Sequence, residues 1–159
     1  MDNEKSNQMI QWSKVIKNGF LATLVMELFY KATNLIFHHG IDVPYANGSM
    51  FHFTSPVLTY FVGYFIDFFG GITFSFLYGR FVRPKFYWSG ILYAVFFVWL
   101  IADGLIFEPM GPAGLFMLDA GLKAVTINLI AHVVYGFVLG FMFSIAGNKT
   151  SIRNLTESK

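Results

Sequence analysis

Hydrophobic residues along the chain gather into four long runs that short polar segments separate. The runs lie near residues 16–38, 56–80, 87–107 and 122–146, and each has the roughly 20 residues that an α-helix needs to cross a bilayer. The pattern predicts an all-α integral membrane protein in which residues 1–159 form one four-helix domain with short polar tails. No small-residue cleavage pattern follows the first run, so we expect a retained helix rather than a signal peptide.

The composition agrees with a membrane protein. Hydrophobic residues make up 55% of the chain and charged residues only 13%, whereas about 25% of a soluble domain is charged. The absence of cysteine excludes disulfides, thiolate metal sites and a cysteine nucleophile. The sequence contains no phosphate-binding loop, no H-E-x-x-H pattern and no Ser-His-Asp order. A non-enzymatic function without a cofactor or nucleic acid is therefore favoured.

The positive charges predict the orientation in the membrane. Nine of the eleven lysine and arginine residues fall in the two terminal segments and in the loop between the second and third runs, whereas the other two connections contain none. Because positive residues stay in the cytoplasm, we expect both termini to be cytoplasmic. The nine residues are Lys5, Lys14, Lys17, Arg80, Arg83, Lys85, Lys149, Arg153 and Lys159.

The second and fourth runs align with each other, which indicates an internal repeat. "DFFGGITFSFLYG" from Asp67 aligns with "HVVYGFVLGFMFS" from His132 at an offset of 65 residues, and "NGFLATL" from Asn18 aligns with "SGILYAV" from Ser89 at an offset of 71. We expect two repeated helical hairpins related by an axis along the membrane normal. The alternative is that any two glycine-rich apolar helices align equally well.

Three short motifs, "NGFLATLVMELF", "PMGPAGL" and "AHVVYGFVLG", resemble the YagU-like group of small bacterial inner-membrane proteins. The resemblance implies a four-helix fold and a bacterial inner-membrane location, and it leaves the activity open because the function of the group is poorly defined. His132 and Gly136 are the positions that match. At the corresponding point of the second helix the group often has a histidine, and this chain has Asp67 instead.

Polar residues inside the apolar runs are the candidate functional site. Helical spacing puts Glu27 and Lys31 on one face of the first helix, and we expect the two charges to neutralise each other. Helix rise places Glu27, Asp67 and His132 near the bilayer centre, where we expect Asp67 and His132 to face each other. Such intramembrane charges face a bundle interior or a water-filled cavity. The predicted proton or substrate cluster is Glu27, Lys31, Asp67, Asn128 and His132.

Two further sets of residues have structural or weaker functional interpretations. We expect the small residues on the helix faces to allow close helix packing; these are Gly63, Gly71, Gly136 and Gly140. Imidazole and carboxylate groups gather in the loop after the first helix, but their spacing matches no known metal site, and we predict no bound metal. These weak metal candidates are His38, His39, Asp42 and His52.

The favoured function is that of a small transporter or channel-like protein, linked to protons through the mid-membrane cluster. A bundle of four helices is narrow, so we expect a homo-oligomer in contact with membrane lipids. Two alternatives stay open. The first is a structural or accessory subunit of a larger membrane complex, in which the buried charges fix helix packing. The second is a lipid- or quinone-binding protein that uses Tyr60, Tyr64 and Trp99 around His132.

Overall fold

The computed structural model describes residues 12–38, 42–82, 86–107 and 114–157, the last twelve of them without their side chains. The described residues form helices and connecting turns, with no strand. In chain order the elements are α2 (Trp12–Phe37), α3 (Val43–Ser49), α4 (Pro56–Leu77), η1 (Tyr78–Val82), α5 (Trp88–Tyr93), η2 (Ala94–Phe107), η4 (Leu115–Ala120) and α6 (Leu122–Glu157).

Four of the helical stretches are long and apolar enough to cross a membrane: Trp12–Phe37, Pro56–Val82, Trp88–Ile106 and Leu122–Ile145. The predicted all-α fold with four spanning helices is therefore confirmed. The first helix begins at Trp12, earlier than the predicted residue 16, because the polar segment before the apolar run is also helical. The third span continues from α5 into η2, which is a wide π-type helix.

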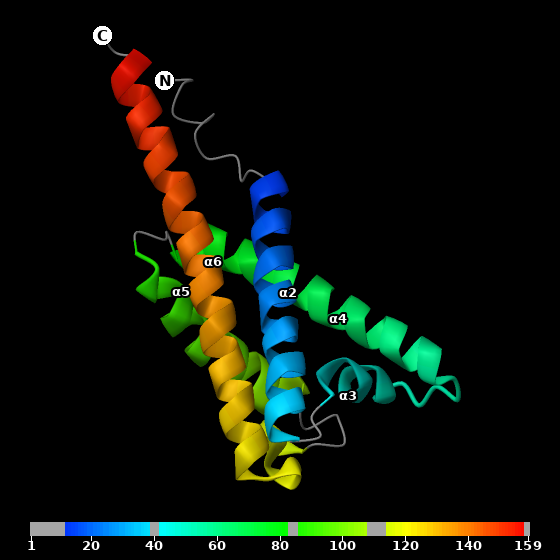
Figure 1. Cartoon of the computed structure of the whole chain (residues 1–159). Helices are drawn as coiled ribbons and strands as arrows, with labels where there is room; N and C mark the ends of the chain where they lie inside the picture. Colours follow the sequence, from blue (N-terminus) through cyan, green and yellow to red (C-terminus); the bar gives the residue numbers. More distant parts are fainter. Residues whose placement is uncertain (1–11, 39–41, 83–85, 108–113, 158–159) are drawn as a thin grey trace.

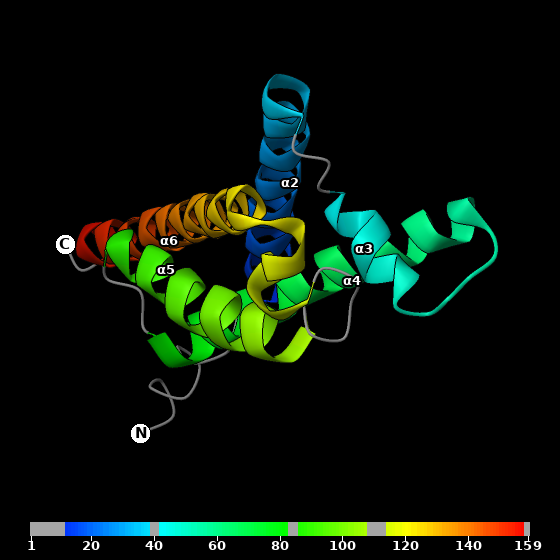
Figure 2. The ribbon, with the colours of Figure 1, turned by 90° about the horizontal axis from the view of Figure 1, so that it is seen from below.

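The helices pack in a chain of neighbours. α2 packs against α4 and α6, and α6 packs in turn against α5 and η2 (Figure 1). By contrast, α4 makes little direct contact with η2. The view from below shows α3 and the N-terminal half of α4 projecting to one side of the other helices (Figure 2). A space between α4 and η2 is consequently left for side chains from several helices to line.

Glycine contacts bring the helices together at two crossings. A Cβ at Gly19 of α2 would lie 2.7 Å from the Ile72 Cα and 2.8 Å from the Gly71 carbonyl oxygen of α4. A Cβ at Gly90 of α5 would clash with the Gly136 carbonyl oxygen of α6 and would lie 2.6 Å from the Gly140 nitrogen. Such close backbone approach is what small residues permit between membrane helices.

The short helix α3 was not predicted from the sequence. Asp42 caps it by accepting a hydrogen bond from the Tyr45 backbone N–H at 3.3 Å, and Pro44 stands in its first turn, where a missing N–H costs nothing. A Cβ at Gly63 of α4 would clash with the Pro44 carbonyl. Gly63 therefore allows α3 to lie directly on α4 in the connection that follows the first span.

Buried apolar residues form two clusters. The first joins all four spans and contains Ala22, Tyr78, Tyr93, Ala94, Val98, Tyr135 and Leu139. The second lies toward the end of the bundle that holds η4 and contains Tyr30, Met117, Ala124, Ile127 and Ala131. Met26 packs against both clusters.

Candidate functional site

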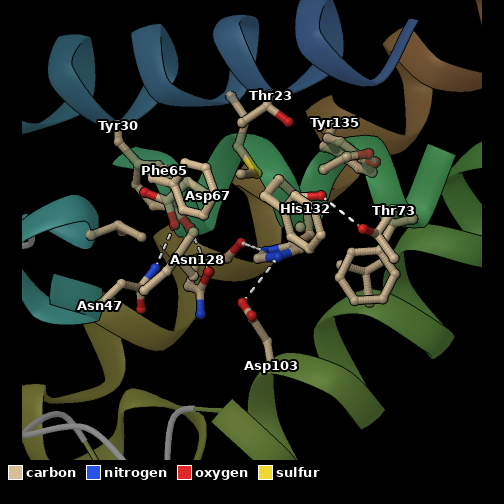
Figure 3. Close-up of a pocket in the computed structure, with 18 of the residues that line it drawn as sticks. Thr23, Tyr30, Asn47, Phe65, Asp67, Thr73, Asp103, Asn128, His132 and Tyr135 are labelled. Atoms are coloured by element: carbon tan, nitrogen blue, oxygen red, sulfur yellow. Dashed lines mark hydrogen bonds and ion pairs between the residues drawn. The ribbon is translucent and has the colours of Figure 1, made fainter. Parts of the chain in front are cut away.

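A cavity of about 460 Å³ lies among α2, α3, α4, η2, η4 and α6. Its volume falls within the range of roughly 300–1,000 Å³ that small-molecule pockets occupy. Most of the wall is apolar, with rings from Phe51, Phe65, Phe69 and Phe74. The polar lining residues are Thr23, Tyr30, Asn47, Asp67, Thr73, Asp103, Asn128, His132 and Tyr135 (Figure 3). A mainly apolar cavity with a few convergent polar groups is typical of a binding site.

His132 and Asp103 form a close contact in the cavity wall, in which the imidazole is buried and the carboxyl group is partly exposed. The His132 Nε2 lies 3.0 Å from the Asp103 Oδ2, and the His132 Nδ1 lies 2.9 Å from the Asn128 carbonyl oxygen (Figure 3). A carbonyl oxygen only accepts hydrogen bonds, so Nδ1 carries a hydrogen and donates. The contact with Asp103 then needs one further proton, on either the imidazole or the carboxyl. The pair consequently has no net charge and holds one proton between its two groups.

Asp67 lies on the α4 wall of the same cavity, and among the described residues only one of its two carboxyl oxygens has a hydrogen-bond partner. Its Oδ1 accepts a hydrogen bond of 2.5 Å from the Asn47 Nδ2 of α3. Its Oδ2 is buried and has no hydrogen-bond partner among the residues that the structure describes. Figure 3 shows Asn47 approaching from α3 and Asp103 approaching His132 from η2. Asp67 therefore presents one oxygen that neither a protein donor nor a protein cation occupies.

Two tyrosines connect the helices around the cavity. The Tyr30 hydroxyl of α2 donates to the Asn128 Oδ1 of α6 at 2.5 Å, and the Tyr135 hydroxyl of α6 donates to the Gly71 carbonyl of α4 at 2.8 Å. Asn128 thus accepts a hydrogen bond from Tyr30 with its side-chain oxygen and one from His132 with its backbone carbonyl oxygen. These bonds hold α6 in a fixed rotation, and that rotation directs His132 toward Asp103.

The expected pair of Glu27 and Lys31 is not formed. The Lys31 Nζ lies 3.7 Å from the Asp42 Oδ1, and the Tyr60 hydroxyl donates to the Asp42 Oδ2 at 2.7 Å. The Glu27 side chain is buried with only 5% of its surface exposed, and neither of its carboxyl oxygens has a hydrogen-bond partner. The long lysine side chain reaches outward to a better hydrated carboxylate, which is the usual behaviour of lysine near a membrane surface.

The structure brings together some of the predicted site residues and separates others. Asp67, Asn128 and His132 all line the cavity, whereas Glu27 and Lys31 do not. Asp67 and His132 share this cavity, but each has a different partner from the one expected. The predicted cluster did not include Asp103, a polar residue of the third helix that was expected to point inward, or Asn47. Asp103 carried a usable signal, because it is a carboxyl inside a spanning run, whereas Asn47 lies in a loop and carried none.

The described residues among the metal and quinone candidates do not line the cavity. His39 lies outside the described residues, and the described part of the chain holds no group of three or more histidine, aspartate or glutamate residues that could bind a metal ion. Tyr60 hydrogen-bonds to Asp42, and the Trp99 ring packs against the Phe116 ring, with centroids 5.4 Å apart. Tyr60, Tyr64 and Trp99 are not among the lining residues of the cavity.

Comparisons of the chain with family models, with curated proteins and with solved structures found no match. The geometry of the cavity is therefore the basis for a functional assignment.

Proposed function

We propose that this protein is a transporter-like membrane protein that binds a small molecule in the cavity and links its movement to a proton on Asp67. The observation that carries this proposal is the charge of the membrane interior. Glu27, Asp67 and Asp103 supply three carboxyl groups inside the spans, and Lys31 of the first span pairs instead with Asp42 before α3. Among the described residues that line the cavity, His132 is the one that can form a cation. A charged residue at the centre of a spanning helix costs roughly 2.5–3.5 kcal/mol even on lenient scales. Each excess carboxylate therefore favours a bound proton or a bound cation.

The proposed roles of Asp67 and of the Asp103–His132 pair differ because their contacts differ. Asp103 and His132 hold one proton between them and remain neutral as a pair. Asp67 lines the cavity, and its buried Oδ2 has no hydrogen-bond partner among the described residues, so we assign proton exchange with the substrate to this carboxyl group. The charged groups around Asp67 are Glu27 on α2, Asp42 before α3, Asp103 on η2 and His132 on α6.

A repeated hairpin is part of the proposal, and the two glycine crossings support it. The alignment with an offset of 71 residues matches Gly19 with Gly90, and the alignment with an offset of 65 matches Gly71 with Gly136. These are the residues at the α2–α4 crossing and at the α5–α6 crossing. Thr23, which corresponds to Ala94, contacts Gly71, and Ala94 contacts Gly136. In two symmetric hairpins, the contact of α2 with α6 would be matched by a contact of η2 with α4. Because α2 packs on α6 but η2 does not pack closely on α4, the cavity lies where the halves differ.

The proposed location is the bacterial inner membrane with both termini in the cytoplasm. Lys14 and Lys17 stand near the start of α2, and Arg80 stands near the end of the second span. The start of α2 and the end of α6 point to the same end of the molecule (Figure 1). We also propose that the protein assembles as a homo-oligomer, because a bundle of four spans is narrow.

A second candidate function is the binding of a lipid or quinone. Phe65 and Phe69 line the cavity, and they are also 61% and 62% exposed on α4. The cavity therefore reaches the lateral surface of the second span, through which an apolar molecule dissolved in the bilayer could enter. Mass spectrometry of the gently solubilised protein separates the candidates, because a lipid- or quinone-binding protein retains its ligand and an accessory subunit retains partner proteins.

The transport proposal is tested with proteoliposomes that contain a pH-sensitive dye. We expect an imposed substrate gradient to move protons across membranes with the wild-type protein, and we expect Asp67→Asn and His132→Ala to abolish this movement while remaining folded. Asp119→Asn is a matched control, because Asp119 is exposed on η4 outside the cavity. Loss of folding in both cavity variants, together with a wild-type protein that moves no protons, would instead support the accessory-subunit alternative.

A further inference from the structure

The cavity wall combines carboxyl groups with aromatic rings and contains no lysine or arginine among the described residues that line it. Its ionisable groups are Asp67, Asp103 and His132, with Tyr30 and Tyr135 already donating hydrogen bonds. The Asp103–His132 pair is neutral as a whole, because one proton is held between its two groups. The remaining carboxylate of Asp67 therefore gives the cavity one uncompensated negative charge whenever it is ionised.

Asp67 is placed to accept a positive group from a ligand. Asn47 donates to its Oδ1 and fixes the plane of the carboxyl group. The second oxygen, Oδ2, is buried and unpartnered, although buried polar atoms in proteins are nearly always satisfied. A cation that entered the cavity would supply the missing partner.

The rest of the wall suits the apolar body of such a ligand. The rings of Phe65 and Phe69 on α4 lie in a stacked arrangement with centroids 5.8 Å apart, and Phe51, Phe74, Tyr30 and Tyr135 complete the aromatic lining. Aromatic faces attract organic cations through the ring quadrupole, most strongly where water is excluded. The hydroxyl groups of Thr23, Tyr30, Thr73 and Tyr135 in this wall already donate hydrogen bonds within the protein. Few of the roughly six to eight oxygen ligands that Ca²⁺ takes are therefore available.

We propose that the cavity binds an organic cation, with its positive nitrogen beside Asp67 and its apolar body against the aromatic rings of α4. This inference rests on the proposed function in taking the cavity as the binding site, and it names the substrate class for that site. An organic anion is disfavoured, because Asp67 and Asp103 both line the cavity and its lining within the described part of the chain contains no lysine or arginine.

Binding and proton exchange are coupled at one atom in this scheme. In the empty cavity the Asp67 carboxyl carries a proton. When a permanently charged ammonium ion binds, the O–H bond of that carboxyl breaks, the proton passes to water, and the carboxylate pairs with the cation. One positive charge replaces another, so the charge of the cavity is unchanged. Each bound quaternary ammonium ion should thus release one proton from Asp67.

The test uses benzyltrimethylammonium as the probe and the purified full chain in detergent. Its matched controls are neopentylbenzene, which replaces the charged nitrogen with carbon, and benzylsulfonate, which reverses the charge. Calorimetric titration in two buffers of different ionisation enthalpy measures both binding and proton release. We expect saturable binding of the ammonium ion with proton release, and binding at least about tenfold weaker for each of the other two compounds.

Variants assign the effect to Asp67. Asp67→Asn should weaken ammonium binding by about tenfold or more and remove the proton release, whereas Asp119→Asn should bind as the wild type does. Asp67→Glu keeps the charge and should retain ammonium selectivity; it decides the matter if Asp67→Asn fails to fold. Equal affinity of the wild type for the ammonium ion and for neopentylbenzene or benzylsulfonate would overturn the inference, as would unchanged binding in a folded Asp67→Asn protein.

The failure of this inference and the failure of the transport proposal give different results. Selective ammonium binding without proton movement in proteoliposomes would uphold the organic cation as ligand and reject transport. Proton movement driven by a neutral or anionic substrate, without ammonium binding, would uphold transport and reject the organic cation.

Discussion

The imidazole of His132 on α6 and the carboxyl group of Asp103 on η2 lie 3.0 Å apart in the wall of the cavity. His132 is also held from its other ring nitrogen by the Asn128 carbonyl, so both nitrogens have fixed partners. The contact joins the third and fourth spans at the level where the aromatic wall of α4 stands opposite. It leaves Asp67 as the carboxyl group of the cavity that is free to receive a ligand.

The first prediction concerns this pair. A double-mutant cycle on Asp103→Ala and His132→Ala should give a coupling free energy of about 1 kcal/mol, the usual size for polar contacts between membrane helices. The matching cycle on Asp67→Ala and His132→Ala should give less than about 0.5 kcal/mol, because those residues have other partners. Reversible unfolding in mixed detergent measures both. A larger coupling for Asp67 than for Asp103 would contradict the observed pairing.

The second prediction concerns Glu27 and Lys31. Glu27→Gln removes a buried carboxyl group that has no partner, so it should leave stability unchanged or raise it by about 1 kcal/mol. Lys31→Met should cost less than about 1 kcal/mol, because the ion pair with Asp42 is well exposed. Thermal unfolding in detergent measures each variant. A large loss in Glu27→Gln that Lys31→Met rescues would show that the two residues are coupled after all.

The third prediction concerns the helix crossings. Gly90→Ala places a methyl group against the Gly136 carbonyl and the Gly140 backbone, and such overpacking should cost about 1–3 kcal/mol. Gly70→Ala is the matched control on α4, because a Cβ at Gly70 meets no atom within 4 Å. The control should be neutral or slightly stabilising, since alanine favours the helix. Equal unfolding temperatures for the two variants would mean that the α5–α6 crossing is less close than described.

The fourth prediction concerns the orientation. The chain has no cysteine, so a single introduced cysteine reports on its own position. Thr54→Cys, in the exposed turn before α4, should react with a membrane-impermeant thiol reagent added to intact cells. Ser13→Cys, at the exposed start of α2, should react only after the cells are opened. Labelling of Ser13→Cys in intact cells would reverse the proposed topology.

The sequence predicted the spanning helices well, because their apolar runs follow directly from the cost of exposing polar groups to lipid. Asp67, Asn128 and His132 could be placed together for a related reason: polar residues in spanning helices turn inward. Their partners could not be predicted. The pairing of Asp103 with His132 depends on the rotation of α6, and the contact of Asn47 with Asp67 depends on α3 folding back onto α4. Neither the rotation nor the fold-back follows from the pattern of any one segment.

The pairing assigned to Glu27 shows the limit of spacing arguments. A separation of four residues places Glu27 and Lys31 on one helix face, but it says nothing of the depth at which each side chain ends. The lysine reaches outward to Asp42, and the glutamate stays among buried residues of α2.

The central claim is that Asp67 gains and loses a proton in the cavity, and infrared difference spectroscopy of the purified protein tests it most directly. A spectrum recorded between acid and alkaline conditions reports the carbonyl stretch that only a protonated carboxyl group shows. Glu27 is a second buried carboxyl group, so we predict two bands in the wild type, one of which is lost only in Asp67→Asn and the other only in Glu27→Gln. Two unchanged bands in a folded Asp67→Asn protein would contradict the account, because the proton would then reside on another group.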